Sequence, residues 1–457
     1  MNQDIIYILP VLFSLLGALI CIPKITYFDK AGSLIGSILS LASVVYLLFQ
    51  PNLIDHYVYV DGFSKLLLLT IAIVYISTVL YSVFYLKHIE NLLFQYRLYY
   101  FLLNVFSAAM FFSVTVDNLG LIWVGIEATT VSSALLIATE NSQATVESAW
   151  RYVIIVSTGL VISLISVTFI YGSAHTLSLH QLLLSHPHNR VFLIGILLGI
   201  IGFGTKAGIF PMHTWLPDVH GKAPAPVSAI FSGVLLPVAL YAIARLIQIF
   251  PSETIRLFAM ILGILTVGIA ALLLTVQVNY KRMYAYSSME NMGMILIGLS
   301  LGKLGLLGAV IIILSHGMAK SSVFFLSGDV LSVYHSTDIE KVKGLMQRMP
   351  RIGASLFMGS MAVTGAPPFG IFVGEFLIFS ALIAQHGWLI ALIVILLLAI
   401  AFISVNFRAG RMIFSHQEKP IKEKTHTETW VSIINLILSF LVILFIPYLE
   451  LLLKNLL

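Results

Sequence analysis

Long apolar runs recur almost without interruption along this chain, and they limit its fold more than any other feature. A run of about 18 or more apolar residues can cross a hydrocarbon layer about 30 Å thick as a helix. Only 10% of the residues are charged, against roughly 25% in soluble domains, so a soluble fold would have little to cover its surface with. The sequence predicts an all-α polytopic membrane protein with about 14 transmembrane helices, centred near Leu15, Ser40, Val74, Ala108, Gly125, Ser163, Leu198, Leu236, Ile264, Ile295, Ser315, Val363, Ile395 and Ile437.

Charge placement between the runs predicts how the helices are oriented. Cytoplasmic loops carry an excess of lysine and arginine. With fourteen spans, the loops after odd-numbered spans hold 17 such residues, whereas the loops after even-numbered spans and the C-terminal end hold 5. The bias predicts that both termini lie on the extracytoplasmic side of the inner membrane. The net charge of +5 follows from this topology and gives no signal for nucleic-acid binding.

The sequence has no pattern typical of a redox or metal cofactor. Its one cysteine, Cys21, lies in the first predicted span, without a Cys-x-x-Cys pair or a cysteine cluster. There is no P-loop and no flavin or nicotinamide fingerprint. We therefore expect no cofactor and no metal in this chain. The first span has an acid, Asp4, and no basic residue before its apolar core, which favours a retained helix over a cleaved signal peptide.

Four ionisable residues lie deep inside predicted spans. Lys206 lies about fifteen residues into its segment, which at about 1.5 Å per residue is roughly 20 Å. Glu127, Lys320 and Glu375 are also bounded by apolar sequence on both sides. Lys65, by contrast, lies at the start of the third span, where its side chain can reach the membrane surface. The sequence thus places two bases and two acids near the bilayer midplane.

Buried charges of both signs favour an ion pathway. An ionised group at the bilayer centre costs at least about 2.5 to 3.5 kcal/mol, and such groups usually face the bundle interior and mark ion routes. The alternative is that they form structural ion pairs between helices. His316 and Lys320 share one helix face as residues i and i+4, and histidine titrates near neutral pH, so the two form a candidate proton relay. For His316 alone, an interhelical hydrogen bond is the competing interpretation.

Glycine and proline interrupt two of the spans, in the segments GFGTKAGIFP (202–211) and TGAPPFGIF (364–372). Non-helical backbone at membrane depth is tolerated only where protein or water satisfies it. Interrupted segments at matching positions of two halves indicate inverted repeats, and residues 207–210 resemble residues 369–372. We predict two inverted five-helix repeats with broken helices 7 and 12. The single membrane domain then comprises residues 1–98 (helices 1–3), 99–250 (repeat one, helices 4–8), 251–410 (repeat two, helices 9–13) and 425–457 (helix 14).

Four stretches carry a family resemblance: KAGIFPMHTWLPDVHGKAPAPVSAIF, NYKRMYAYSSMENMG, SHGMAKSSVFFLSGD and GAPPFGIFVGEF. They resemble the antiporter-like, proton-translocating membrane subunits of respiratory complex I and of group 4 membrane hydrogenases, and are most similar to component F of hydrogenase-4. The M-type subunit of complex I and the D-type subunit of multisubunit sodium/proton antiporters come next. The resemblance covers residues 61–411 and implies a fourteen-helix fold with a central row of charged residues.

The resemblance also implies which residues carry the proton. Glu127 matches the family's fifth-helix glutamate, and Lys206 matches the lysine of the broken seventh helix. These two are expected to separate and re-form as a pair during a cycle. His316 and Lys320 fall at central-axis positions of helix eleven. Glu375 matches the twelfth-helix glutamate of the M-type and hydrogenase forms, where other members have lysine.

One family position differs in this chain. Complex I subunits usually carry a lysine in helix eight, whereas the stretch SGVLLPVALYA offers Pro237 and Val238 there. The proton must then pass from helix seven toward helix eleven through water, through Ser228 or Ser232, or through another side chain.

Three further residues are lesser candidates. Glu290, near the cytoplasmic start of the tenth predicted span, is a candidate for an input channel. His213 and His220 fall in the predicted cytoplasmic loop HTWLPDVH. No third ligand of convincing spacing accompanies these histidines, so a structural role is favoured over metal binding.

Together these patterns predict a proton-translocating subunit of a redox-driven membrane complex, of the hydrogenase-4/formate hydrogenlyase or NADH–quinone oxidoreductase kind. Moving one charge against about 100 mV costs about 2.3 kcal/mol, and no motif in this chain supplies it. We therefore expect other membrane subunits and a peripheral redox arm as partners. Two alternatives stay open: a subunit of a multisubunit sodium/proton antiporter or ion-coupled uptake system, and a non-conducting membrane scaffold.

Overall fold

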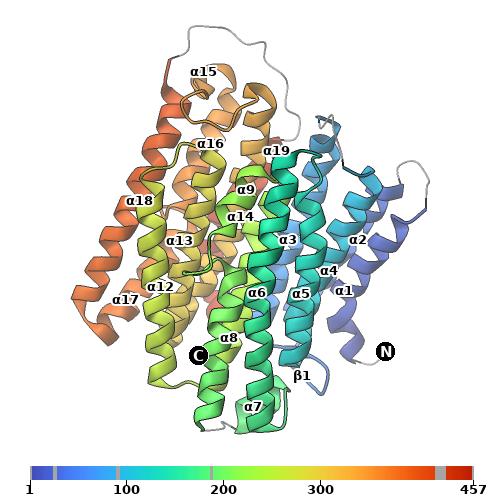
Figure 1. Ribbon diagram of the computed structural model, residues 1–457, viewed down its shortest axis with the longest axis vertical. Helices are drawn as coiled ribbons and strands as arrows, with labels where there is room; N and C mark the ends of the chain where they lie inside the picture. The colour runs from blue at the N-terminus through green and yellow to red at the C-terminus, as the bar shows by residue number, and fades with distance from the viewer. Residues whose placement is uncertain (1–2, 24–27, 89–92, 186–188, 417–428, 455–457) are drawn as a thin grey trace.

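The computed structural model describes residues 3–23, 28–88, 93–185, 189–416 and 429–454. Most of these residues lie in helices that run roughly along one axis (Figure 1). The short helices α7 (Leu179–Ser185) and α15 (Leu345–Arg348) lie at opposite ends of the bundle, which we name the α7 end and the α15 end. The predicted all-α fold is confirmed.

The first part of the chain supplies three long helices, an antiparallel hairpin and a 3-10 turn. Asp61 caps α3 by accepting a hydrogen bond from the Ser64 backbone amide. Lys65, predicted to reach the membrane surface, is only 2% exposed, and its Nζ donates to the Gln50 carbonyl in the α2–β1 connection at 2.5 Å. The elements are α1 (Gln3–Ile20), α2 (Phe28–Leu48), β1 (Leu53–Ile54), β2 (Tyr59–Val60), α3 (Gly62–Tyr85) and η1 (Leu86–His88).

The next part contains the first broken helix, in which α8 and α9 are separated by non-helical chain. Its elements are α4 (Tyr96–Thr115), α5 (Leu119–Ile137), α6 (Gln143–Ala174), α7, α8 (Arg190–Ala207), α9 (Trp215–Lys222), α10 (Ala225–Ile230), the π-helix η2 (Phe231–Leu235) and α11 (Leu236–Ile249).

The last part contains the second broken helix, formed by α16 and α17. Its elements are α12 (Glu253–Leu274), α13 (Tyr280–Ser300), α14 (Gly302–Tyr334), α15, α16 (Pro350–Val363), α17 (Gly370–His386), α18 (Trp388–Phe414), α19 (Thr429–Leu441), η3 (Val442–Phe445) and α20 (Ile446–Leu453).

Within the described residues, 11 helices are long and apolar enough to cross a membrane. Two shorter apolar helices, Asp4–Ile20 and Gly370–His386, fall below the length used for this count. The helix α13 is long but carries many polar residues. The predicted total of fourteen spans therefore stays a prediction, and so do the predicted repeat boundaries.

The two breaks share their local backbone. Gly208 follows α8 with a φ of 74°, and Gly365 follows α16 with a φ of 71°. Three residues after each glycine comes a proline in a cis peptide bond, Pro211 in the first break and Pro368 in the second. The similar sequences at residues 207–210 and 369–372 do not occupy equivalent places in the two breaks. Residues 207–210 lead from α8 into the first break, whereas residues 369–372 lead out of the second break into α17.

Two further features recur on opposite ends of the bundle. The long helices α6 and α14 both end in a histidine with left-handed backbone, His175 and His335. The Leu119 amide then donates to the Leu177 carbonyl, and the Tyr280 amide donates to the Thr337 carbonyl. Such recurrence is what two inverted repeats would produce.

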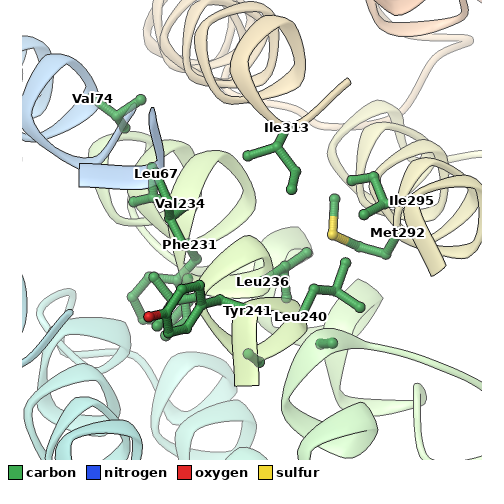
Figure 2. Close-up of a cluster of buried hydrophobic side chains, with 14 of the residues drawn as sticks. Leu67, Val74, Phe231, Val234, Leu236, Leu240, Tyr241, Met292, Ile295 and Ile313 are labelled. Atoms are coloured by element: carbon green, nitrogen blue, oxygen red, sulfur yellow. The ribbon is translucent and has the colours of Figure 1, made fainter. Parts of the chain in front are cut away.

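The centre of the bundle is formed by α14 and by the segment 225–249, because the most apolar stretch of each is completely buried. Figure 2 shows Phe231 and Leu236 of this segment, with Leu67 of α3, Met292 of α13 and Ile313 of α14 around it. The predicted pathway residues of α14 therefore lie at the core of the molecule.

Candidate proton pathway

Lys206 lies at the end of α8, inside the bundle. The helix stops there because Gly208 adopts a left-handed conformation that glycine tolerates. The Lys206 side chain is fully buried, and its Nζ donates to Thr130 Oγ1 of α5 at 2.9 Å and to Tyr152 OH of α6 at 2.5 Å. Ser133 Oγ lies 2.7 Å from the same tyrosine hydroxyl. Hydroxyl groups thus surround the ammonium group.

Glu127 lies one turn before Thr130 on α5 and is half-buried. Its charge attracts the Lys206 ammonium, but no direct ion pair joins the two side chains in the described part of the chain. Glu127 Oε2 has no hydrogen-bond partner among the described residues. The structure therefore holds these two residues in a separated arrangement.

The indole of Trp215 holds the two halves of the first broken helix together. Its Nε1 donates at 2.8 Å to the Thr205 carbonyl near the end of α8, which also accepts from the Gly208 amide at 3.2 Å. The indole also contacts the Tyr152 ring, with 5.0 Å between centroids. As a result, α9 is fixed directly against the Lys206 site.

His220 of α9 and Ser228 of α10 place unpaired polar atoms inside the bundle. His220 is fully buried and its ring stacks on Phe324 of α14, with 4.9 Å between centroids. Neither His220 ring nitrogen, nor Ser228 Oγ, has a partner within the residues that the structure describes. His220 also interacts electrostatically with Lys320. Because buried polar groups are normally paired, such atoms call for water or a moving side chain.

The π-helix η2 directs a backbone carbonyl toward His316. In a π-helix each amide bonds to the carbonyl five residues earlier, as Leu236 does to Phe231. The next residue, Pro237, has no amide hydrogen and cannot occupy the carbonyl of Ser232 in this way. His316 Nε2 lies 3.2 Å from that oxygen. Pro237 therefore leaves the Ser232 carbonyl as an acceptor for the histidine.

Lys320 of α14 is fully buried and faces α13. Its Nζ donates to the Tyr284 carbonyl at 3.0 Å and to the Ser287 hydroxyl. It also interacts electrostatically with Glu290, further along α13. As with Lys206, neutral oxygen atoms provide its direct contacts.

Glu375 of α17 lies beside the second break. Gly365 contacts its carboxylate so closely that a Cβ at that glycine would lie 2.2 Å from Glu375 Oε2. Glu375 also interacts electrostatically with Glu290. Asn291 Nδ2 donates to Glu290 Oε2 at 3.3 Å and to the Val363 carbonyl, at the end of α16, at 3.0 Å. The second break thus holds two acidic side chains near one another.

The structure places the predicted residues in two clusters with a short connection between them. The connection is formed by α9 and α10, and α9 packs against both α6 and α13. The first cluster contains Glu127 and Lys206; the second contains Ser232, His316, Lys320, Glu290 and Glu375; His220 and Ser228 lie on the connection.

Two of the sequence-based placements are wrong. Glu290 is not near the end of its span: it lies ten residues into α13, about 15 Å along the helix, beside Lys320. His220 is not in a loop, because the HTWLPDVH stretch continues into α9 and is folded into the bundle. His213 lies in the first break, where its ring is 6.0 Å from that of Phe210.

Sequence reasoning missed a buried lysine at the α15 end, because Lys281 is one of the 17 basic residues assigned to loops, and it also missed the half-buried Glu140 that attracts this lysine. Lys281 is 2% exposed, and its Nζ donates to the Ala223 carbonyl at 2.6 Å. Burial raises the pKa of Glu140, in the α5–α6 connection, and the attraction of Lys281 opposes this rise. The adjacent Arg282 made the site look like an ordinary basic loop.

Arg245, also counted as a loop residue, is fully buried in α11. Its Nη1 and Nη2 each lie 2.7 Å from an oxygen of Asp61. The guanidinium lies 4.8 Å from the Tyr59 ring centroid and 4.6 Å from that of Tyr241. This ion pair joins α3 to α11. The apolar residues on both sides of Arg245 were the signal that it is internal.

Comparison with known proteins identifies the family and the fold of the chain. Residues 116–401 match the family model described as NADH:quinone oxidoreductase/Mrp antiporter, transmembrane. The hydrogenase-4 component F homolog of Methylacidiphilum infernorum is 32% identical over 378 residues, covering 78% of this chain and 79% of the relative. Several other curated relatives are longer, and the chain covers about half to two thirds of their length.

Two solved structures have the same fold. A chain of the archaeal membrane-bound sulfane sulfur reductase aligns with a TM-score of 0.87 at 25% identity, covering 100% of this chain and 97% of its own length. A chain of the Mrp complex from Dietzia sp. DQ12-45-1b aligns with a TM-score of 0.88 at 18% identity, covering 99% and 96%. The first of these structures is described as an archaeal respiratory membrane complex, and the second as a complex.

Proposed function

The chain belongs to the NADH:quinone oxidoreductase/Mrp antiporter transmembrane family, and we propose that it moves protons across the membrane through its two clusters of buried ionisable side chains. It is a multi-pass membrane protein that works beside other membrane subunits. One observation carries the proposal: buried bases and acids succeed one another from the first broken helix to the second. Burying an ionisable group in a membrane costs free energy, and the groups that are present there usually mark an ion pathway.

The first step uses the separated pair. When Glu127 lies close to Lys206, its negative charge stabilises the protonated lysine. When Glu127 is drawn away, the ammonium depends on Thr130 and Tyr152 alone. A buried cation without its counter-charge holds its proton less tightly, so the proton is released toward the second cluster.

The proton then crosses the gap left by the missing helix-eight lysine. We propose that water bound at His220 and Ser228, together with the Ser232–His316 contact, carries it across. The unpaired atoms of His220 and Ser228 support this route. On the far side, Lys320, Glu290 and Glu375 receive the proton in succession.

We also propose an orientation of the chain in the membrane and a source of energy for transport. The positive-inside rule places the α15 end in the cytoplasm and both termini outside the inner membrane. Transport against about 100 mV needs about 2.3 kcal/mol per charge, which we assign to a peripheral redox arm of a hydrogenase-4-like or NADH–quinone oxidoreductase-like complex. The chain itself needs no cofactor for these steps.

A second candidate is a subunit of a multisubunit sodium/proton antiporter, with an ion-coupled uptake system as a related possibility. The observation that favours the antiporter is the TM-score of 0.88 to a chain of the Mrp complex. In that case a sodium gradient replaces the redox arm as the source of energy.

The test is proton uptake by vesicles that contain the assembled complex. Lys206→Ala removes the central proton carrier and is expected to lower uptake at least tenfold. Lys341→Ala, at an exposed lysine near α15, is the matched control and should leave uptake unchanged. Normal assembly with unchanged uptake in the Lys206 variant would support the scaffold interpretation and overturn the proposal. Uptake that needs sodium rather than an electron donor would favour the antiporter.

A further inference from the structure

A cavity of about 440 Å³ opens at the α7 end, away from the proton pathway. It lies among the ends of α7, α11, α12, α13 and α14, and β2 contributes one residue. Its volume is within the range of small-ligand sites. Its polar lining consists of the side chains of Tyr59, Gln248, Arg256 and Lys303.

Two positively charged side chains line the cavity. Arg256 and Lys303 are both exposed and line it from different helices. Arg190, at the start of α8, is exposed at the same end but does not line it. The lining contains no acidic residue; Glu253, in the first turn of α12, is exposed outside it. The cavity therefore favours an anion.

The helix ends around the cavity do not change this preference. The helices α12 and α14 begin there, whereas α11 and α13 end there. The positive N-terminal ends and the negative C-terminal ends offset one another, so the preference for an anion rests on Arg256 and Lys303.

The rest of the lining is apolar, with Leu183, Ile247, Leu299 and Leu306 among its members. A free anion gains nothing from such walls, whereas a lipid gains by placing its glycerol and upper acyl carbons against them. The position at the end of the apolar helices matches the depth of lipid headgroups.

We propose that this cavity binds the phosphate of an anionic phospholipid headgroup, with Arg256 and Lys303 as its charged contacts. Gln248 connects the site to the core, because its Oε1 accepts a hydrogen bond from the buried Arg245. Basic pockets between transmembrane helices on the cytoplasmic side hold anionic lipid headgroups, and this cavity is the corresponding kind of site at the opposite end of the bundle. The inference does not depend on the proposed proton transport.

The experiment measures lipid retention by the full-length chain. The chain is purified with phosphatidylglycerol or phosphatidylcholine, and bound lipid is counted by native mass spectrometry. The double variant Arg256→Gln/Lys303→Gln should bind phosphatidylglycerol roughly thirtyfold more weakly, about fivefold for each cation. Arg190→Gln is the matched control and should bind like the unaltered chain. The melting temperature without lipid shows whether the variants fold.

The measurements distinguish a phospholipid headgroup from free inorganic phosphate as the ligand. The proposal expects phosphatidylglycerol to bind and to raise the melting temperature of the unaltered chain, an effect that the double variant loses. Equal binding of phosphatidylglycerol by the double variant would overturn it, and so would an equal loss in the Arg190 control. Binding of inorganic phosphate that displaces the lipid completely would mean that the site recognises the free anion instead.

Discussion

Gly365 determines where the carboxylate of Glu375 can lie. Its φ of 71° ends α16, and its missing side chain is the space against which the carboxylate packs. The sequence allowed both residues to be singled out, because glycine and glutamate stand out in an apolar run. Their contact could not be predicted, since they lie in different halves of the broken helix. The same is true of Lys206 and Tyr152, which meet only through the packing of α6 against α8.

The substitution Gly365→Ala tests this contact. Left-handed backbone costs a residue with a Cβ about 1–2 kcal/mol, and the new Cβ would also displace Glu375. Gly302→Ala is the matched control, because it has a φ of 69° but no atom within 4 Å of the added Cβ. We expect both variants to lose similar stability from the backbone, measured by thermal unfolding, whereas only Gly365→Ala sharply lowers proton uptake. Equal uptake by the two variants would contradict the role of the contact.

At the scale of elements, irregular helices place the polar groups. The π-helix η2 and its following proline leave the Ser232 carbonyl to His316, and the two breaks end helices inside the bundle. Glycine and proline in apolar runs predicted both breaks. They did not predict the π-helix, because Pro237 alone does not indicate which hydrogen-bond pattern precedes it. The match between residues 207–210 and 369–372 does not align the two breaks, because the glycine and the cis-proline that the breaks share lie at residues 208 and 211 in the first and at residues 365 and 368 in the second.

Pro237→Ala restores an amide hydrogen that can bond to the Ser232 carbonyl and so compete with His316. A proline inside a helix costs stability, so this variant should be as stable as the unaltered chain or more stable. The lost histidine contact, worth about 1 kcal/mol, should slow proton uptake about fivefold. Pro226→Ala, in the first turn of α10, is the control and should transport normally. A more stable Pro237 variant with full transport would show that the contact is not used.

At the scale of the whole molecule, the N-terminal helices are anchored to the central segment by charge as well as by apolar packing. The Asp61–Arg245 pair joins α3 to α11 near the α7 end, and Ser64 Oγ also accepts from Arg245 at 3.0 Å. Apolar runs and glycine breaks were enough to predict the bundle. They could not predict this anchor, because a charge four residues from the end of an apolar run resembles a loop residue in sequence.

The last prediction concerns this anchor. Breaking a buried ion pair by removing one partner costs about 3–5 kcal/mol, because the other charge stays buried without compensation. Arg245→Met should therefore lower the thermal stability of the purified chain strongly. The double variant Asp61→Asn/Arg245→Met removes both charges but keeps a capping oxygen for α3, and it should recover most of the loss, since no charge stays buried without compensation. If the double variant is as unstable as the single one, the guanidinium stabilises the bundle mainly through the rings of Tyr59 and Tyr241, and the charge pair is secondary.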